Sequence, residues 1–192
     1  MIQTMGQCGD GSSRVRLDER AELRVVPAAR DDLAGYVNLL EELANWLETR
    51  GIRQWPRGRV NQSTTYFAGS IARQEVQLAF IGEELVGTLR LLMSDPIVWP
   101  EAQHDDAVYI YNLGVRRTWA GHDLGGRLLD WAQRRAASLG RHFVRLDCKH
   151  DNGFLRGYYE RKGFSARGEV DADYPHPVGR ERLCRFEKPV PV

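Results

Sequence analysis

A glycine-rich stretch in the second half of the chain has the composition of a phosphate-binding loop. It consists of Ala120, Gly121, His122, Asp123, Leu124, Gly125 and Gly126. Three glycines within six residues, at the start of an expected helix, leave backbone N–H groups free and let a ligand approach without interference from Cβ atoms. Such N–H groups can cradle the oxygens of a pyrophosphate. A tight strand-to-helix turn, which needs glycine only for its own backbone angles, is the alternative interpretation.

The spacing of these glycines disfavours two common nucleotide sites. The dinucleotide fingerprint Gly-x-Gly-x-x-Gly is absent, and so is a P-loop that ends in Gly-Lys-Ser/Thr. We therefore do not expect an NAD or ATP site.

The elements that would position this loop form a strand–helix–strand unit. Residues 108–115 are apolar on both faces, which is typical of a central strand. From Leu124 onward, apolar residues recur at helical spacing until Gly140, which is placed to end the helix. Residues 143–148 form the next strand, and a helical crossover of this length predicts that the two strands are parallel.

The remaining periodicity predicts further helices and strands on both sides of this unit, and the fold class is α/β. The expected elements are a strand at 23–26, one or two helices within 31–50, a short helix at 66–73, a hairpin of strands at 76–81 and 85–92, a helix at 153–162 and a final strand at 182–187.

Composition narrows the class of protein. The 192 residues are enough for one domain, and 42% apolar with 28% charged residues is ordinary for a globular chain. A net charge of +1 disfavours nucleic acid as a partner, and no apolar stretch approaches the roughly 18 residues that cross a membrane. Residues 1–21 lack the apolar core of a signal peptide and are expected to be a flexible tail, which leaves residues 22–192 as a single cytoplasmic domain. The spacing of Cys8, Cys148 and Cys184 predicts neither a disulfide framework nor a metal site.

Several segments together resemble the acetyl-CoA-binding core of the GNAT acetyltransferases. They are Leu113-Gly114-Val115, the loop from Ala120 to Gly125, Leu128-Leu129, Leu146-Asp147, Asn152 and the run from Tyr158 to Phe164. Farther upstream, residues 46–56 are similar to a bacterial subgroup of the same family. The resemblance covers about residues 23–188, and it implies a central mixed β-sheet flanked by helices, with acetyl-CoA as co-substrate and no metal.

The resemblance also implies roles for individual residues. The strand segment Leu113, Gly114 and Val115 would pair with the pantetheine arm, and the loop from Ala120 to Gly126 would bind the pyrophosphate. Asn152 would contact the pantetheine, although an asparagine there is equally a helix cap. Tyr159 would be the general acid that protonates the CoA sulfur, with packing in the core as the alternative.

The loop departs from the family pattern Gln/Arg-x-x-Gly-x-Gly/Ala, because only the final Gly125 agrees. Ala120 lacks a polar side chain, and Asp123 places a carboxylate where glycine is expected. That carboxylate could fold back onto the helix N–H groups that would hold phosphate, or it could point to solvent. Arg116, Arg117 and Arg127 are candidates for compensating positive charge, or they are solvated surface residues.

The predicted function is N-acetylation of a primary amine of a small molecule, by direct attack of the amine on acetyl-CoA. The first half of the chain would bind the amine, with Trp46, Gln54, Trp55 and Trp99 as the wall or, alternatively, with these tryptophans in the core. No carboxylate stands on the strand that precedes the loop, so the base is a chain of water molecules or one of Asp147, His150 and His122. Cys148 has no evident base partner for an acetyl-cysteine intermediate. A protein or peptide N-acetyltransferase and a non-catalytic acyl-CoA-binding regulator are the alternatives, and the oligomeric state is open, a homodimer included.

Overall fold

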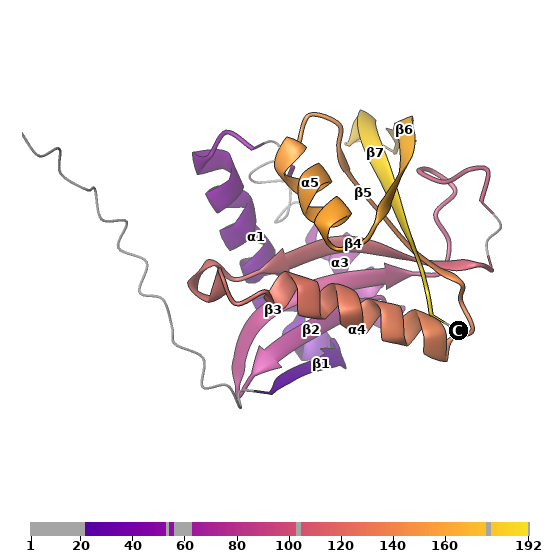
Figure 1. Cartoon of the computed structure of the whole chain (residues 1–192). Coiled ribbons are helices and arrows are strands. Elements are labelled where there is room, and N and C mark those ends of the chain that lie inside the picture. Colours follow the sequence, from indigo (N-terminus) through magenta and orange to yellow (C-terminus); the bar gives the residue numbers. More distant parts are fainter. Residues whose placement is uncertain (1–21, 53, 56–62, 103–104, 176–177, 192) are drawn as a thin grey trace, which may run out of the picture.

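The computed structural model describes residues 22–52, 54–55, 63–102, 105–175 and 178–191, and one seven-stranded mixed sheet organises them (Figure 1). The strand order is β1-β2-β3-β4-β5-β7-β6, and β4 and β5 are the parallel neighbours while all other neighbours are antiparallel. The strands are β1 (Leu23–Pro27), β2 (Val76–Ile81), β3 (Glu84–Leu92), β4 (Ala107–Val115), β5 (Phe143–Lys149), β6 (Ser165–Tyr174) and β7 (Gly179–Pro189).

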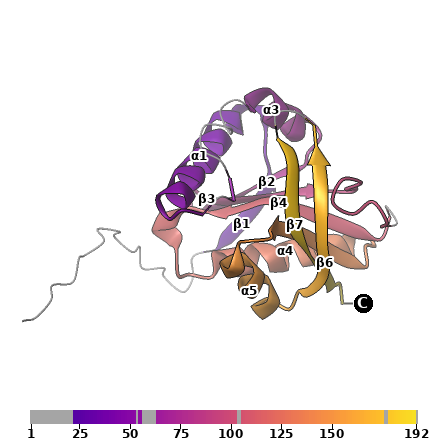
Figure 2. The same ribbon diagram turned by 90° about the horizontal axis from the view of Figure 1, so that it is seen from above.

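Helices cover the two faces of the sheet (Figure 2). On one face lie α4 (Leu124–Ser138) and α5 (Gly153–Arg161), whose apolar side chains join those of β3, β4 and β5 in the largest core cluster. On the other face lie α1 (Leu33–Thr49) and α3 (Thr64–Ala72), which pack on β2 and β3 in a second cluster. Two short 3-10 turns, Arg30–Asp32 and Arg117–Trp119, precede α1 and α4.

The strand–helix–strand unit predicted from the sequence is confirmed. Its strands are β4 and β5, which pair in parallel, and its helix is α4. Gly140 follows the helix at a φ of 67°, a left-handed conformation that glycine adopts at little cost. The 23–26 strand, the 66–73 helix and the 76–92 hairpin also have counterparts within one or two residues.

The strand β6 is the element that the sequence pattern missed. It is an edge strand with side chains that are mostly exposed, so it shows no alternation of apolar and polar residues. The expected tail at residues 1–21 lies outside the described residues. None of the helices in the described part of the chain is both long and apolar enough to span a membrane.

Candidate active site

The central strands β4 and β5 part in the middle of the sheet. Their parallel pairing extends from Ala107 opposite Phe143 to Ile110 opposite Leu146 and stops there. Beyond this point β4 pairs only with β3, while β5 continues toward α5 (Figure 1). A bulge at Asn112, whose φ is 48°, redirects β4 where the strands part. The residues expected to meet the pantetheine, Leu113 to Val115, therefore lie on a stretch of β4 whose β5 side has no strand partner.

The glycine-rich loop connects β4 to α4, as expected. Different constraints require glycine at its individual positions. Gly121 has a φ of 89° and open space around it, so its backbone angle alone requires glycine. A Cβ on Gly125 would lie 2.7 Å from the hydroxyl of Tyr158, and one on Gly126 would lie 2.5 Å from Nζ of Lys162. These two glycines let side chains of α5 close onto the first turn of α4. His122, in the same loop, packs against the ring of Trp119, with 6.1 Å between ring centroids.

Asp123 takes neither of the two orientations considered from the sequence: its carboxylate lies beside the first turn of α4, where a Cβ on Gly126 would come within 2.6 Å of both oxygens, but it does not cap the helix. Asp123 is the N-cap residue of α4, in a left-handed conformation with a φ of 51°, and its side chain accepts no capping hydrogen bond. Instead, its Oδ2 lies 2.7 Å from Nζ of Lys162 on α5. The carboxylate is thus paired with Lys162 beside the first turn of α4, and it accepts no hydrogen bond from the N–H groups of that turn.

The arginines near the loop are engaged to different degrees. Arg116 forms an ion pair with Glu42, with 3.2 Å between its Nε and the carboxylate oxygen, so its charge is already paired. Arg117 stacks on the indole of Trp46, with its Cζ 3.8 Å from the ring centroid, and Arg50 lies over the same ring at 5.4 Å. Burial and the neighbouring charge of Arg50 lower the pKa of Arg117. Trp46 is therefore a platform for two guanidinium groups.

Tyr159 lies beneath the sheet, on the face of α4 and α5. It is 6% exposed, and its ring packs against Phe164 and Phe186 in the core. Burial, followed by the proximity of Cys148 and Asp147, raises its pKa far above the usual value for tyrosine, so its hydroxyl stays protonated. Its neighbour Tyr158 stacks on the exposed ring of Phe154 and points its hydroxyl at Gly125.

Gln54 and Asn152 are 98 residues apart in the sequence and meet at the end of β5. The Asn152 side chain caps α5 by accepting a hydrogen bond from the backbone N–H of Leu155 at 3.0 Å. It also donates to Oε1 of Gln54 at 3.1 Å, and the backbone N–H of Lys149 donates to the same oxygen at 3.2 Å. Gln54 therefore satisfies a β5 amide beyond the point where β4 has turned away.

The tryptophans proposed as a substrate wall differ in exposure and surroundings. Trp55 lies over β4, and a Cβ on Gly114 would come within 3.2 Å of its ring. Trp99 is 4% exposed and is held in the core between the guanidinium groups of Arg145 and Arg185, each about 5 Å from its ring centroid. Trp99 therefore offers no surface to a substrate, because those two side chains enclose it.

Asp147, one of the three side chains that the sequence offered as a base, stands where β4 and β5 part. Asp147 directly follows Leu146, the last residue of β5 that pairs with β4. It points to the face opposite Tyr159 and α4, because Leu146 and Cys148 belong to the α4 core. Its side chain keeps a small accessible surface, yet burial and the nearby charge of Asp95 raise its pKa to about 7. The available signal was a central strand with charged residues on alternate positions, Arg145, Asp147 and Lys149.

Two tyrosines and a second carboxylate surround Asp147. Tyr111 of β4 donates a hydrogen bond to Oδ2 of Asp95 at 2.6 Å, and Asp95 also accepts from the backbone N–H of Val98 at 3.1 Å. The negative charge of Asp147 raises the pKa of Tyr111 and of Tyr174 on β6, after the larger effect of burial. The four side chains form a polar cluster on one face of the divergence, which we call the acidic cluster (Asp95, Tyr111, Asp147, Tyr174).

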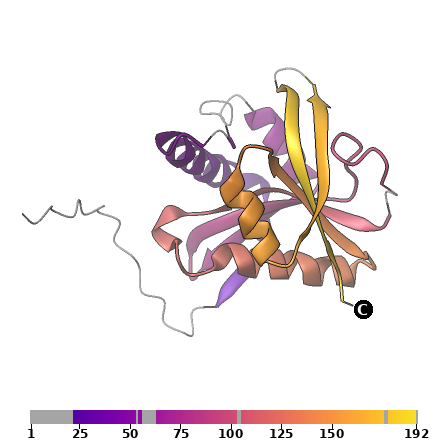
Figure 3. The ribbon, with the colours of Figure 1, turned by 45° about the horizontal axis from the view of Figure 1, so that its top comes forward.

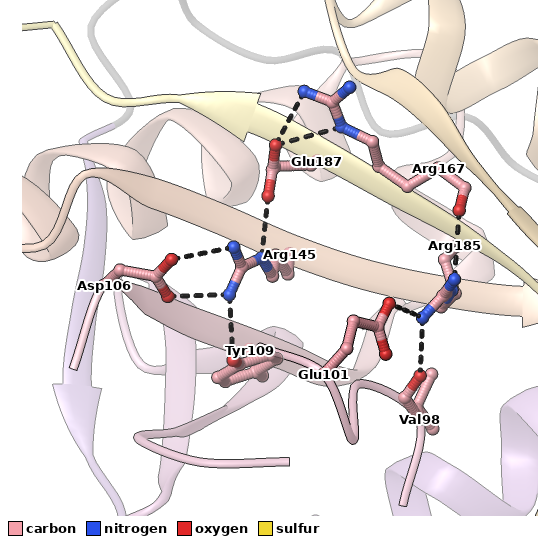
Figure 4. Close-up of polar contacts among 8 residues, drawn as sticks. All are labelled: Val98, Glu101, Asp106, Tyr109, Arg145, Arg167, Arg185 and Glu187. Atoms are coloured by element: carbon pink, nitrogen blue, oxygen red, sulfur yellow. Dashed lines mark hydrogen bonds and ion pairs between the residues drawn. The ribbon is translucent and has the colours of Figure 1, made fainter. Parts of the chain in front are cut away.

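A network of arginines fixes the loop that carries Asp95 (Figure 4). Arg145 binds both oxygens of Asp106, at 2.7 and 2.9 Å, and donates to Glu187 at 2.8 Å. Arg185 donates to Glu101 and to the backbone carbonyl of Val98. The middle of the β3–β4 connection is thereby tied to β7, and its C-terminal end is tied to β5. The described residues contain no group of three or more His, Cys, Asp or Glu side chains placed to hold a metal ion.

Comparison with known proteins defines the class. Residues 40–164 match the model of the acetyltransferase (GNAT) family, so the chain belongs to that family and is an N-acetyltransferase. It is 33% identical to the uncharacterized N-acetyltransferase YesJ of Bacillus subtilis over 164 residues, which is 81% of this chain and 88% of YesJ. The interpretation as a non-catalytic regulator is therefore set aside.

Solved structures agree on the fold. An acetyltransferase of the GNAT family from Listeria monocytogenes has a TM-score of 0.74 at 23% identity, covering 91% of this chain and 98% of its own. An acetyltransferase from Salmonella typhimurium that modifies the N-terminal serine of the 50S ribosomal subunit protein L7/L12 has a TM-score of 0.67 at 16% identity, covering 88% and 95%. At these identities the likeness concerns the fold alone.

Proposed function

We propose that the protein transfers the acetyl group of acetyl-CoA to the primary amine of a small molecule, by direct attack of the amine on the thioester. One observation carries the proposal: Asp147 and Tyr159 lie on opposite faces of the sheet at the place where β4 and β5 part. A thioester held between the strands would have a proton acceptor on one side and a hydroxyl donor on the other.

The cofactor would lie along the unpaired side of β4. The backbone of Leu113, Gly114 and Val115 offers hydrogen-bonding groups to the amides of pantetheine, as an adjacent strand would. The N–H groups of the first turn of α4, which no side chain caps, would receive the pyrophosphate. Asn152 uses its carbonyl oxygen for the cap of α5, so its NH2 group is the part left to meet the pantetheine as well as Gln54.

Asp147 would act as the general base. An amine reaches the site as an ammonium ion and must lose a proton before its nitrogen can attack. A carboxylate with a pKa of about 7 is a far stronger base than an ordinary aspartate and is still substantially ionised at neutral pH. One proton passes from the ammonium nitrogen to Asp147, and the N–C bond forms. The tetrahedral intermediate then breaks its C–S bond, and the second proton of its nitrogen passes through solvent to the departing sulfur.

Tyr159 would assist the departing sulfur. Because burial keeps its hydroxyl protonated, it can donate a hydrogen bond that stabilises the thiolate as the C–S bond breaks. Cys148 is not suited to carry the acetyl group, since burial raises the pKa of its thiol to about 12 and leaves almost no thiolate. This supports direct attack over an acetyl-cysteine intermediate.

The acceptor could instead be the N-terminal amine of a protein. The fold relative from Salmonella typhimurium modifies an N-terminal serine, and an N-terminal amine meets the same chemical needs. We favour a small molecule because the proposed base lies deep among buried groups, and because the hydrogen bonds of Gln54 tie the loop after α1 onto β5 beside it. A bulky chain would have less room there than a compact amine.

The experiment is a CoA-release assay with acetyl-CoA and a panel of small amines, amino acids and N-terminal peptides. We expect turnover with a small amine, and a kcat lowered about 100-fold or more in Tyr159→Phe with acetyl-CoA affinity within a few-fold of wild type. Tyr158→Phe is the matched control and should lose much less in kcat. Turnover confined to peptides would refute the small-molecule assignment, and equal activity of the two tyrosine variants would refute the role of Tyr159.

A further inference from the structure

The acceptor side of the proposed active site holds negative charge that no cation among the described residues neutralises. Asp147 makes no hydrogen bond or ion pair with any other described residue, and Asp95 is only 5% exposed. The groups that hold Asp95 in place are a tyrosine hydroxyl and a backbone N–H, and both are uncharged.

The basic side chains on this face are committed to other carboxylates. Arg145 is paired with Asp106 and Glu187, and Arg185 with Glu101, as Figure 4 shows. Lys149, two residues after Asp147, pairs with Glu181 at 2.8 Å. In the described part of β5 and β7, this face therefore offers no free cation to a ligand.

The other groups around Asp147 are neutral. Tyr111 from β4 and Tyr174 from β6 have pKa values raised by burial and by neighbouring carboxylates, so both are phenols at neutral pH. From the opposite face Tyr159 is likewise neutral. The charge that an incoming acceptor meets is thus set by two carboxylates, one of which titrates near neutrality.

We propose that this acidic cluster selects the acceptor by charge: the enzyme acetylates amines that have no carboxylate beside the reacting nitrogen, and it rejects α-amino acids. The inference rests on the proposed function, because it uses the same divergence of β4 and β5. An ammonium group is attracted to the cluster, whereas the carboxylate of an α-amino acid would be held within a few ångströms of two like charges, with no cation on the described part of β5 and β7 to receive it. The partly desolvated site makes that repulsion stronger than it would be in water.

Matched pairs that differ by a single carboxylate test the inference. The pairs are tyramine and tyrosine, tryptamine and tryptophan, ethanolamine and serine, and cadaverine and lysine. We expect the amine to exceed the amino acid in kcat/KM by about 100-fold in each pair that is turned over, a ratio consistent with one repulsive contact at about 6 Å in a protein environment. A ratio near one, or a preference for the amino acid, overturns the inference while leaving acetyl transfer itself established.

Asp95→Asn provides the sharper measurement. Asparagine keeps a carbonyl oxygen to accept from the N–H of Val98, and its NH2 group can donate to the hydroxyl oxygen of Tyr111. The substitution removes the charge, so the ratio within a pair should fall about tenfold. A purely structural role for Asp95 would lower both members of a pair equally and leave the ratio unchanged, which would contradict the proposal. Asp105→Asn, which removes an exposed carboxylate paired with Arg141, is the matched control and should not change the ratio.

Titration calorimetry covers the case in which no pair is turned over. The same amines and amino acids are titrated into the protein saturated with CoA. Tighter binding of the amine supports the inference, and tighter binding of the amino acid, or binding of neither member in every pair, overturns it. A protein that neither binds acetyl-CoA in the same instrument nor releases CoA with any acceptor would refute the proposed function itself.

Discussion

Replacing Asp147 by asparagine should stabilise the folded protein at high pH while it removes the proposed base. The folded environment raises the pKa of this carboxyl from its ordinary value of 3.8 to about 7. The unfolded chain releases this proton near pH 4, whereas the folded protein keeps it until about pH 7. Between these two pH values the folded state therefore loses stability as the pH rises. At about 1.4 kcal/mol for each tenfold change, the full cost at pH 8 approaches 4 kcal/mol. Asparagine has no charge to bury and escapes this cost.

The assay is equilibrium urea unfolding of wild type and Asp147→Asn from pH 5 to pH 8.5. The free energy of unfolding of the variant, relative to wild type, should grow with pH and level off above about pH 7.5, at several kcal/mol. Asp105→Asn, an exposed carboxylate, should show almost no such trend. A difference between wild type and Asp147→Asn that does not change with pH would refute the account of this carboxyl as buried and perturbed.

Two further predictions concern the cofactor site. Acetyl-CoA at one hundred times its dissociation constant should stabilise the protein by about 2.7 kcal/mol, which a thermal melt detects and which an unmoved melt would contradict. Asp123→Gly should tighten acetyl-CoA binding up to about tenfold at low salt, because it frees Lys162 for the pyrophosphate, removes a like charge and suits the left-handed backbone of that position. Weaker binding measured by calorimetry at low salt would show that the Asp123–Lys162 pair helps to build the site rather than competing for it.

The sequence predicted the half of the fold in which local pattern and burial agree. Strand β4 is apolar on both faces because it is central, and α4 has a clear apolar stripe that ends at Gly140. Strand β6 was missed because an edge strand with mostly exposed side chains needs no apolar alternation. Its formation depends on pairing with β7, which is tertiary information.

In the candidate site, too, the sequence revealed only the parts that local pattern defines. The loop and Tyr159 could be found because their residues are close together in the sequence and match a family pattern. The acidic cluster could not, since it joins side chains from the β3–β4 connection, β4, β5 and β6, and since the pKa of Asp147 depends on the depth of burial rather than on its neighbours in the chain. The fate of Asp123 was equally hidden, because its partner Lys162 lies 39 residues away.

The hydrogen bonds of Gln54 make the two halves of the chain interdependent. This one amide oxygen receives both an N–H of β5 and the side chain that caps α5, so the segment after α1 sets where α5 begins (Figure 3). A change of acceptor preference by grafting the α1 region of a relative would then also disturb the helix that carries Tyr159, unless the graft keeps a hydrogen-bond acceptor at position 54. A substitution that changes the acceptor-binding region would therefore also shift the helix that carries the proposed leaving-group residue.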